Sequence, residues 1–264
     1  MSSATVRVER DGGWLHATLN RPKRRNAMSL EMVDALMDVF ATVEQDPTVR
    51  AVVLRGEGGH FCSGGDLADM QAAAGEHATH GDPIARLNRR FGTMLQRVDG
   101  CRAAVVAVCE GGVMGGGFGL ACVADVTLAV QDARFRLPET SLGITPAQIA
   151  PFLVQRLGLS QARRLAVTGQ TLGADEALRL GLVHEVCAVD DVSDRLQSIL
   201  DRIRRCEPGA VAATKALMNR VAARELDDIL DDAALEFATL ARKPEAATGM
   251  MAMLSRSTPP WAES

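Results

Sequence analysis

The chain has 264 residues, of which 47% are hydrophobic and 23% are charged, and its formal net charge is −4 at pH 7. This length can bury the core of one large domain, or of a domain with a helical appendage. The longest run of basic residues is Lys23-Arg24-Arg25, so the clustered positive charge typical of nucleic-acid-binding proteins is absent. No apolar run is long enough to span a membrane, and the N-terminus lacks a signal-peptide pattern. We therefore expect a cytoplasmic protein with no nucleic-acid or membrane partner.

The first half of the chain alternates apolar strand-like runs with helical patterns, which predicts an α/β core. Residues 29–45 have the signature of a helix, with Ser29 as N-cap and an apolar face repeated every three to four residues. Strands are expected over residues 51–54 and 103–108, both of which are continuously apolar.

The segments that follow these strands differ in character. The polar stretch 71–82 is interpreted as a mobile or substrate-shaped loop, and residues 84–98 as an amphipathic helix. After Ser160 the pattern becomes helical, and residues 208–254 predict three short helices.

Two glycine-rich turns, at residues 61–67 and 111–120, each follow an apolar strand-like run and precede a helical pattern. The first N–H groups of a helix lack partners within it and carry the positive end of the helix dipole. Two such groups aimed at one carbonyl oxygen would form an oxyanion hole, which stabilises negative charge in acyl and enolate chemistry. Neither turn has the spacing of a dinucleotide or phosphate-binding loop.

The cysteines show no Cys-x-x-Cys pair and no nearby histidines at metal-binding spacing, so we expect no metal site. They are interpreted as small buried hydrophobes in a reducing compartment. A nucleophilic Cys62 would need a histidine base, and the neighbouring His60 points to the opposite face of an extended segment. The six cysteines are Cys62, Cys101, Cys109, Cys122, Cys187 and Cys206.

Five blocks in order resemble the crotonase family, also called the enoyl-CoA hydratase/isomerase superfamily. The similarity extends from about residue 6 to residue 256. The resemblance implies an α/β, crotonase-like ββα spiral core over residues 1–200, and a C-terminal helical trimerisation region over residues 201–264. A homotrimer or a hexamer is therefore expected. The blocks are residues 19–28, 61–67, 111–120, 135–139 and 174–183.

The resemblance also implies the catalytic residues. In this family the N–H groups equivalent to those of Gly65 and Gly116 bind the thioester oxygen of an acyl-CoA. Glu139 occupies the position of the family's general acid–base. A carboxylate in a partly desolvated pocket has a raised pKa, which suits proton transfer at carbon.

Coenzyme A enters as part of the substrate, and no separate cofactor is implied. By resemblance, the basic loop Lys23-Arg24-Arg25 contacts its nucleotide end, and Arg256 adds a phosphate contact, which a neighbouring subunit's ligand could also receive. The stretch around the first turn brackets the adenine and pantetheine groups. The residues assigned to it are Cys62, Gly64, Asp66 and Leu67.

The chain departs from the two-glutamate hydratases at Gly119, where those enzymes carry their second carboxylate. With one carboxylate, a Δ3,Δ2-enoyl-CoA isomerase is chemically natural. Residues 113–120 and 145–151 instead resemble the branch with methylglutaconyl-CoA and isohexenylglutaconyl-CoA hydratases, which favours hydration of a branched or carboxylated enoyl-CoA. An inactive acyl-CoA-binding homologue is a third reading, although Glu139 and both oxyanion glycines are retained. Placing glutamate at residue 119 should restore the missing carboxylate if the pocket accommodates it.

Overall fold

The computed structural model describes residues 5–75, 82–221 and 226–263. Within these residues the strands are β1 (Val6–Asp11), β2 (Trp14–Leu19), β3 (Ala51–Gly56), β4 (Ala104–Cys109), β5 (Gly112–Met114), β6 (Val126–Val130), β7 (Arg134–Arg136), β8 (Thr171–Gly173) and β9 (Glu185–Cys187). The α-helices are α1 (Leu30–Gln45), α2 (Leu67–Gly75), α3 (Pro83–Asp99), α4 (Gly116–Val123), α5 (Ala150–Thr168), α6 (Ala174–Leu180), α7 (Val192–Arg204), α8 (Pro208–Val221), α9 (Leu226–Ala241) and α10 (Pro244–Ser255). Short 3-10 helices are η1 (Pro22–Arg24), η2 (Glu139–Leu142), η3 (Val189–Asp191) and η4 (Pro260–Ala262).

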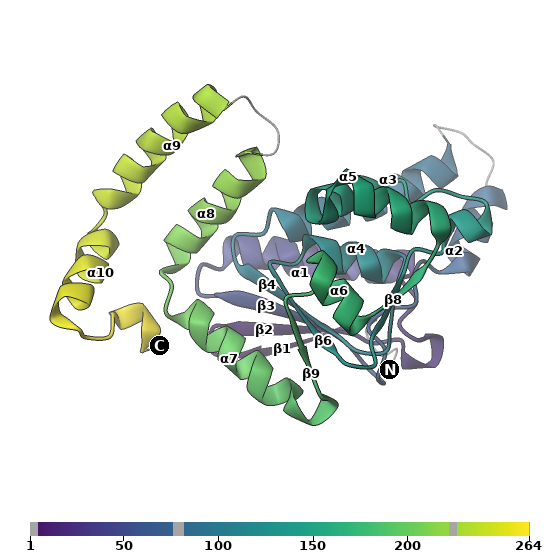
Figure 1. Ribbon diagram of the computed structural model, residues 1–264, viewed down its shortest axis with the longest axis horizontal. Coiled ribbons are helices and arrows are strands. Elements are labelled where there is room, and N and C mark those ends of the chain that lie inside the picture. Colours follow the sequence, from purple (N-terminus) through teal and green to yellow (C-terminus); the bar gives the residue numbers. More distant parts are fainter. Residues whose placement is uncertain (1–4, 76–81, 222–225, 264) are drawn as a thin grey trace.

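The described strands form a six-stranded sheet in the order β1-β2-β3-β4-β6-β9 and a three-stranded sheet in the order β5-β7-β8. In the larger sheet only β1 and β2 pair antiparallel, and the remaining neighbours are parallel. Helices α1, α3, α4 and α5 lie on one side of this sheet and α7 lies on the other (Figure 1). A parallel sheet covered on both faces needs apolar strands, and every residue of β4 is buried.

The helix predicted over residues 29–45 is confirmed as α1, and the Ser29 hydroxyl accepts a hydrogen bond from the Met32 N–H at 3.3 Å. The loop predicted over residues 71–82 is wrong for residues 71–75, which belong to α2. Alanine and glutamine are good helix formers, and the Asp66 carboxylate accepts a hydrogen bond from the Ala68 N–H at 2.9 Å near the start of the helix. Asp82 is the N-cap of α3, and residues 76–81 lie outside the described part of the chain.

The C-terminal helices α8, α9 and α10 match the three predicted helical segments. They extend away from the sheet on one side of the molecule, and α9 and α10 stand farthest from it (Figure 1). Helix α8 is attached to the core by Lys215, whose ammonium group lies 2.5 Å from the Asp125 carboxylate and donates to the Ala103 carbonyl at 2.8 Å.

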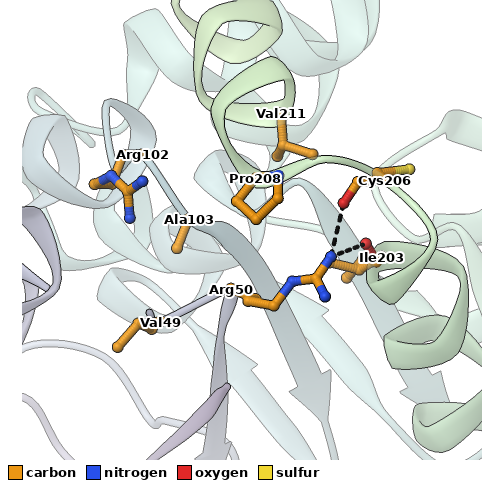
Figure 2. Close-up of a pocket in the computed structure, with 8 residues that line it drawn as sticks. All are labelled: Val49, Arg50, Arg102, Ala103, Ile203, Cys206, Pro208 and Val211. Atoms are coloured by element: carbon orange, nitrogen blue, oxygen red, sulfur yellow. Dashed lines mark hydrogen bonds between the residues drawn. The ribbon is translucent and has the colours of Figure 1, made fainter. Parts of the chain in front are cut away.

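Arg50 holds the end of α7 where the chain leaves the core. Its guanidinium donates to the carbonyls of Ile203 and Cys206 at 3.3 Å and 2.7 Å, beside a small hollow that Pro208 and Val211 also line (Figure 2). The carbonyls at the end of a helix lack intrahelical partners, so a guanidinium there satisfies them. No residue of the two glycine turns lines this hollow.

Candidate active site

The two glycine turns lie directly against each other. The Cys62 N–H donates to the Gly112 carbonyl at 3.0 Å, and the Met114 N–H donates to the Cys62 carbonyl at 2.8 Å. A Cβ atom on Gly117 would lie 2.7 Å from the Cβ of Cys62, which is closer than such atoms approach. Glycine at residue 117 therefore allows the start of α4 to pack on the first turn.

Each turn contains a backbone conformation that favours glycine. Gly64 has φ of 104° and Gly115 has φ of 48°, in the left-handed region that side chains rarely adopt. A Cβ on Gly115 would also lie 3.3 Å from the Cα of Gly64. The backbone conformation thus accounts for glycine at both positions, independently of any ligand.

The N–H groups of Gly65 and Gly116 differ from those of their neighbours. Around Gly65, the Met28 N–H donates to the Gly64 carbonyl at 2.8 Å and the Asp66 N–H donates to the Met28 carbonyl at 2.9 Å. Gly116 is the first residue of α4. In the described part of the chain, no hydrogen bond has the Gly65 or the Gly116 N–H as its donor, so both groups are available to a ligand.

Glu139 lies beside these turns, at the start of η2. Its Oε1 would be 3.0 Å from a Cβ on Gly115, the residue that precedes Gly116. Its Oε2 is buried and has no hydrogen-bond partner among the described residues. Burial raises the pKa of this carboxyl, partly offset by a hydrogen bond from its own backbone N–H. A half-buried carboxyl with an unused buried oxygen is suited to exchanging a proton with a ligand.

Apolar side chains form a wall around Gly119, the position at which the two-glutamate hydratases carry their second carboxylate. A Cβ on Gly119 would lie 3.2 Å from Cγ1 of Ile149, 3.3 Å from Cδ1 of Leu95 and 3.4 Å from Cζ of Phe91. These distances are tight for a methyl group alone. Glutamate at residue 119 would require these side chains to move by a few tenths of an ångström for its Cβ alone, so whether the pocket accommodates the carboxylate stays a prediction.

The basic loop is exposed and fastened to the first turn through its backbone. The Ser63 N–H donates to the Arg25 carbonyl at 3.0 Å, and the Ser63 hydroxyl donates to the Arg24 carbonyl at 3.2 Å. The side chains of Lys23, Arg24 and Arg25 are therefore presented next to residues 61–67.

Asn26, which the sequence analysis did not single out, holds this loop in place through hydrogen bonds of its side chain. It is fully buried, has φ of 55°, and donates to the carbonyls of Glu57 and His60 at 2.9 Å and 2.7 Å, while its Oδ1 accepts from the Arg21 N–H at 2.8 Å. A non-glycine residue in the left-handed region costs conformational energy, which these hydrogen bonds offset. The sequence signal that could have identified Asn26 was its position within the block of residues 19–28 that resembles the family.

The remaining residues of the first turn differ in accessibility. Cys62 and Gly64 are buried, Asp66 is half-buried, and Gly65 and Leu67 are exposed. Asp66 forms an ion pair of 2.7 Å with Arg21. Burial alone would raise the pKa of Asp66, but the hydrogen bonds from Arg21 and from the Ala68 N–H outweigh it, so the pKa lies below its usual value. Asp66 is a carboxylate at neutral pH, already paired with a cation.

Cys62 is not poised as a nucleophile. Burial raises the pKa of its thiol to about 11, so the thiol is protonated at neutral pH. The Nδ1 atom of His60 accepts a hydrogen bond from the Gly112 N–H at 3.0 Å and is occupied there.

Arg256 is the C-cap of α10, on the part of the chain that extends from the core. Figure 1 shows α10 at the opposite end of the molecule from α2 and α3. Among the described residues, no group of three or more His, Cys, Asp or Glu side chains could hold a metal ion. None of the helices among the described residues is long and apolar enough to cross a membrane.

Comparison with known proteins identifies the family. The family model described as enoyl-CoA hydratase/isomerase matches residues 9–264. An enoyl-CoA hydratase/isomerase structure from Marinobacter aquaeolei is 50% identical, with a TM-score of 0.94 over 98% of this chain and 99% of that chain. Pseudomonas aeruginosa AtuE is 51% identical, with the same TM-score and the same coverage. Enoyl-CoA hydratase ACTT6 of Alternaria alternata is 32% identical over 81% of this chain and 69% of its own. The chain therefore belongs to the enoyl-CoA hydratase/isomerase family, the crotonases, and is an enzyme of that family.

Proposed function

We propose that this enzyme adds water across the 2,3 double bond of an enoyl-CoA thioester through an oxyanion-stabilised enolate. One observation carries the proposal: the half-buried Glu139, whose buried Oε2 is unpaired among the described residues, adjoins two turns whose Gly65 and Gly116 N–H groups have no acceptor there. A proton carrier beside two free donors is the arrangement that enolate chemistry requires.

In the proposed reaction, the N–H groups of Gly65 and Gly116 donate to the thioester oxygen. This polarises the carbonyl and makes the β-carbon electrophilic. Glu139 takes a proton from a water molecule as its oxygen bonds to the β-carbon, and electron density moves onto the thioester oxygen as an enolate. Glu139 then returns the proton to the α-carbon, so one carboxyl serves both steps and no cofactor is consumed.

Isomerisation is the second candidate, and the apolar wall at Gly119 favours it. A Δ3,Δ2-enoyl-CoA isomerase needs one base, because Glu139 can remove a proton at one carbon and return it at another. Hydration is preferred because residues 113–120 and 145–151 resemble the branch of methylglutaconyl-CoA and isohexenylglutaconyl-CoA hydratases. That resemblance also supports a branched or carboxylated acyl group as the substrate.

Coenzyme A is proposed to lie along the first turn, with its phosphates near Lys23, Arg24 and Arg25. Their exposed side chains can act as point charges for phosphate groups. Asp66 and Leu67, together with the backbone near Cys62 and Gly64, are proposed to border the adenine and pantetheine. Arg256 is proposed as a further phosphate contact, to this chain's ligand or to that of a neighbouring subunit.

Residues 1–200 are proposed as the catalytic core and residues 201–264 as an oligomerisation region that forms a homotrimer or a hexamer. Large apolar side chains on α9 and α10 support this assignment, because patches of this kind mark interaction surfaces. Phe237 is 74% exposed, Met253 is 84% exposed and Leu254 is 80% exposed.

The test is a panel of straight, branched and carboxylated enoyl-CoA thioesters, each with its double bond at the 2 or the 3 position. Loss of the enoyl absorbance, with the hydroxyacyl product identified by mass, measures hydration, while migration of the double bond leaves the mass unchanged. The proposal expects hydration of 2-enoyl substrates to be the faster reaction. Rapid migration on 3-enoyl substrates without hydration of any 2-enoyl thioester would assign the enzyme as an isomerase.

A further inference from the structure

A short backbone bridge fixes the direction of the Gly65 N–H. On either side of Gly65, the Gly64 carbonyl accepts from the Met28 N–H at 2.8 Å and the Asp66 N–H donates to the Met28 carbonyl at 2.9 Å. This pairing is an isolated parallel bridge outside the strands of both sheets. Because the neighbours of Gly65 both bond to Met28, the N–H of Gly65 itself points to the opposite side. The direction of this donor therefore depends on two hydrogen bonds.

The guanidinium of Arg21 joins the two segments of this bridge. Its Nη2 lies 2.7 Å from Oδ2 of Asp66, the residue after Gly65. Its Nη1 donates to the carbonyl of Ala27, the residue before Met28. One planar group thus holds both segments beside the paired residues, and it uses a separate nitrogen for each. We call this contact the Arg21–Asp66 clamp.

Both side chains of the clamp are fixed by further hydrogen bonds. The Arg21 backbone N–H donates to Oδ1 of the buried Asn26 at 2.8 Å. Oδ1 of Asp66 accepts from the Ala68 N–H at 2.9 Å. The side chains of Arg21 and Asp66 are 23% and 16% exposed, so both are largely shielded from water. An ion pair in such a place is screened by salt less than one on the open surface.

The clamp depends on the shape of an arginine side chain. The guanidinium is planar and presents several N–H donors in fixed directions, so it reaches a carboxylate and a carbonyl at the same time. The ammonium group of lysine is a single point on a flexible stem. Lysine at residue 21 would therefore keep the charge but could not hold both acceptors in the same geometry.

We propose that Arg21 is a positioning residue for the Gly65 N–H, and that the Arg21–Asp66 clamp holds the bridge between Met28 and Gly65 so that this donor stays aimed at the thioester oxygen. The inference rests on the proposed use of Gly65 as an oxyanion donor. It holds for hydration and for double-bond migration, because both place negative charge on the same oxygen. Arg21 acts through the backbone and takes no part in proton transfer.

The clamp is tested by the infrared spectrum of a bound thioester that is not turned over. Butyryl-CoA with ¹³C at the thioester carbon is saturated, so it reports hydrogen bonding to its carbonyl oxygen. On the native protein its carbonyl stretch should lie below the frequency in water. In Arg21→Lys this displacement should shrink at saturating ligand, because the Gly65 N–H is less well aligned. The kcat on the best enoyl-CoA of the panel should fall roughly 10- to 100-fold, with little change in KM.

Asp66→Asn is a second, independent variant, because it keeps the shape of the side chain and removes the charge that holds Arg21. The two substitutions break the same contact, so the double variant should be no slower than the slower single variant. Arg10→Lys is the matched control. Arg10 also holds a carboxylate and a carbonyl, those of Asp46 at 2.6 Å and Gly12 at 2.9 Å. It lies on β1 at the edge of the larger sheet, so its substitution should change neither measurement.

The outcomes separate the clamp from the proposed function. Native displacement and native kcat in Arg21→Lys and Asp66→Asn, both folded by circular dichroism, would overturn the inference and leave the oxyanion hole in place. A carbonyl that absorbs at its solution frequency on the native protein would overturn the clamp and the oxyanion hole together. If the native protein hydrates no enoyl-CoA while the displacement still depends on Arg21, the hydratase function is refuted and the clamp stands.

Discussion

Two regions of the molecule differ in how well their side chains are buried within one chain. The first is the junction of the two glycine turns, and the second is the group of C-terminal helices. At the junction, Cys62 is fully buried, its backbone is paired with the second turn, and Gly117 packs on it. On α9 and α10, apolar side chains such as Phe237 and Leu254 are mostly exposed. The contacts between the two turns are thus made within one chain, whereas α9 and α10 expose apolar side chains that the proposed oligomer would bury.

The largest effect is expected from Glu139→Gln, which keeps the shape of the side chain and removes its proton-carrying function. Hydration of the best substrate in the panel should fall by at least about 10³-fold, towards the upper end of the contribution of general acid–base catalysis. Binding of the thioester, measured by calorimetry, should change little. More than a few per cent of native turnover in the purified variant would show that another residue moves the proton.

Gly116→Pro tests the second turn by deleting its N–H group. Proline is favoured at the first position of a helix, and Gly116 holds that position in α4, so the fold should persist. We expect the rate to fall roughly 10²–10³-fold, as for the loss of one oxyanion-hole donor. Gly116→Ala is the control, because it keeps the N–H while its Cβ would lie 3.3 Å from Met28 and Phe91. Equal rates in the two variants would mean that the N–H is not used.

The C-terminal surface is tested by Phe237→Asp, assayed by sedimentation. The side chain is largely exposed in the isolated chain, so the subunit should remain folded. If a partner buries it, losing about 1.5–3 kcal/mol of apolar burial per site should raise the dissociation constant roughly 10- to 100-fold. If the variant forms the same oligomer as the native protein, Phe237 does not lie in the interface. If the native protein is a monomer, the proposed interface does not exist.

A smaller effect concerns the stability of Glu139→Gln as a function of pH. Because burial raises the pKa of Glu139 in the folded chain, the folded state holds this proton more tightly than the unfolded state. This contribution to stability is present below the ordinary glutamate pKa and is lost as pH rises through the raised value. The Tm of the variant relative to native protein should therefore be higher at pH 8 than at pH 4. A difference that is independent of pH would contradict the raised pKa.

The sequence predicted those elements whose formation depends on neighbouring residues in the chain. Helix α1 follows from its N-cap Ser29 and its apolar period, and the two turns follow from glycines after apolar runs. Residues 71–75 were misassigned because their low hydrophobicity was given more weight than the helix propensity of alanine and glutamine. Glu139 and the two oxyanion glycines were assigned by family resemblance, and their catalytic roles stay predictions.

Contacts between distant segments could not be predicted. Gln148 and Asn88 are 60 residues apart, and neither shows a pattern that indicates the other. Glycine at residue 119 indicated, by resemblance, that the second carboxylate is missing, but the apolar side chains around this glycine depend on how α3 and the segment before α5 pack against α4. The requirement for glycine at residues 92 and 117 arises in the same way, from side chains that approach from elsewhere in the chain.

The proposed reaction depends on the N–H groups of Gly65 and Gly116 polarising the thioester carbonyl. The most direct measurement is isotope-edited difference infrared spectroscopy of an enoyl-CoA with ¹³C at the thioester carbon, bound to Glu139→Gln so that turnover is blocked. We predict a carbonyl stretch at clearly lower frequency than in water, and a smaller displacement when Gly116→Pro is added. A bound thioester whose carbonyl absorbs at its solution frequency would show that these N–H groups do not polarise it.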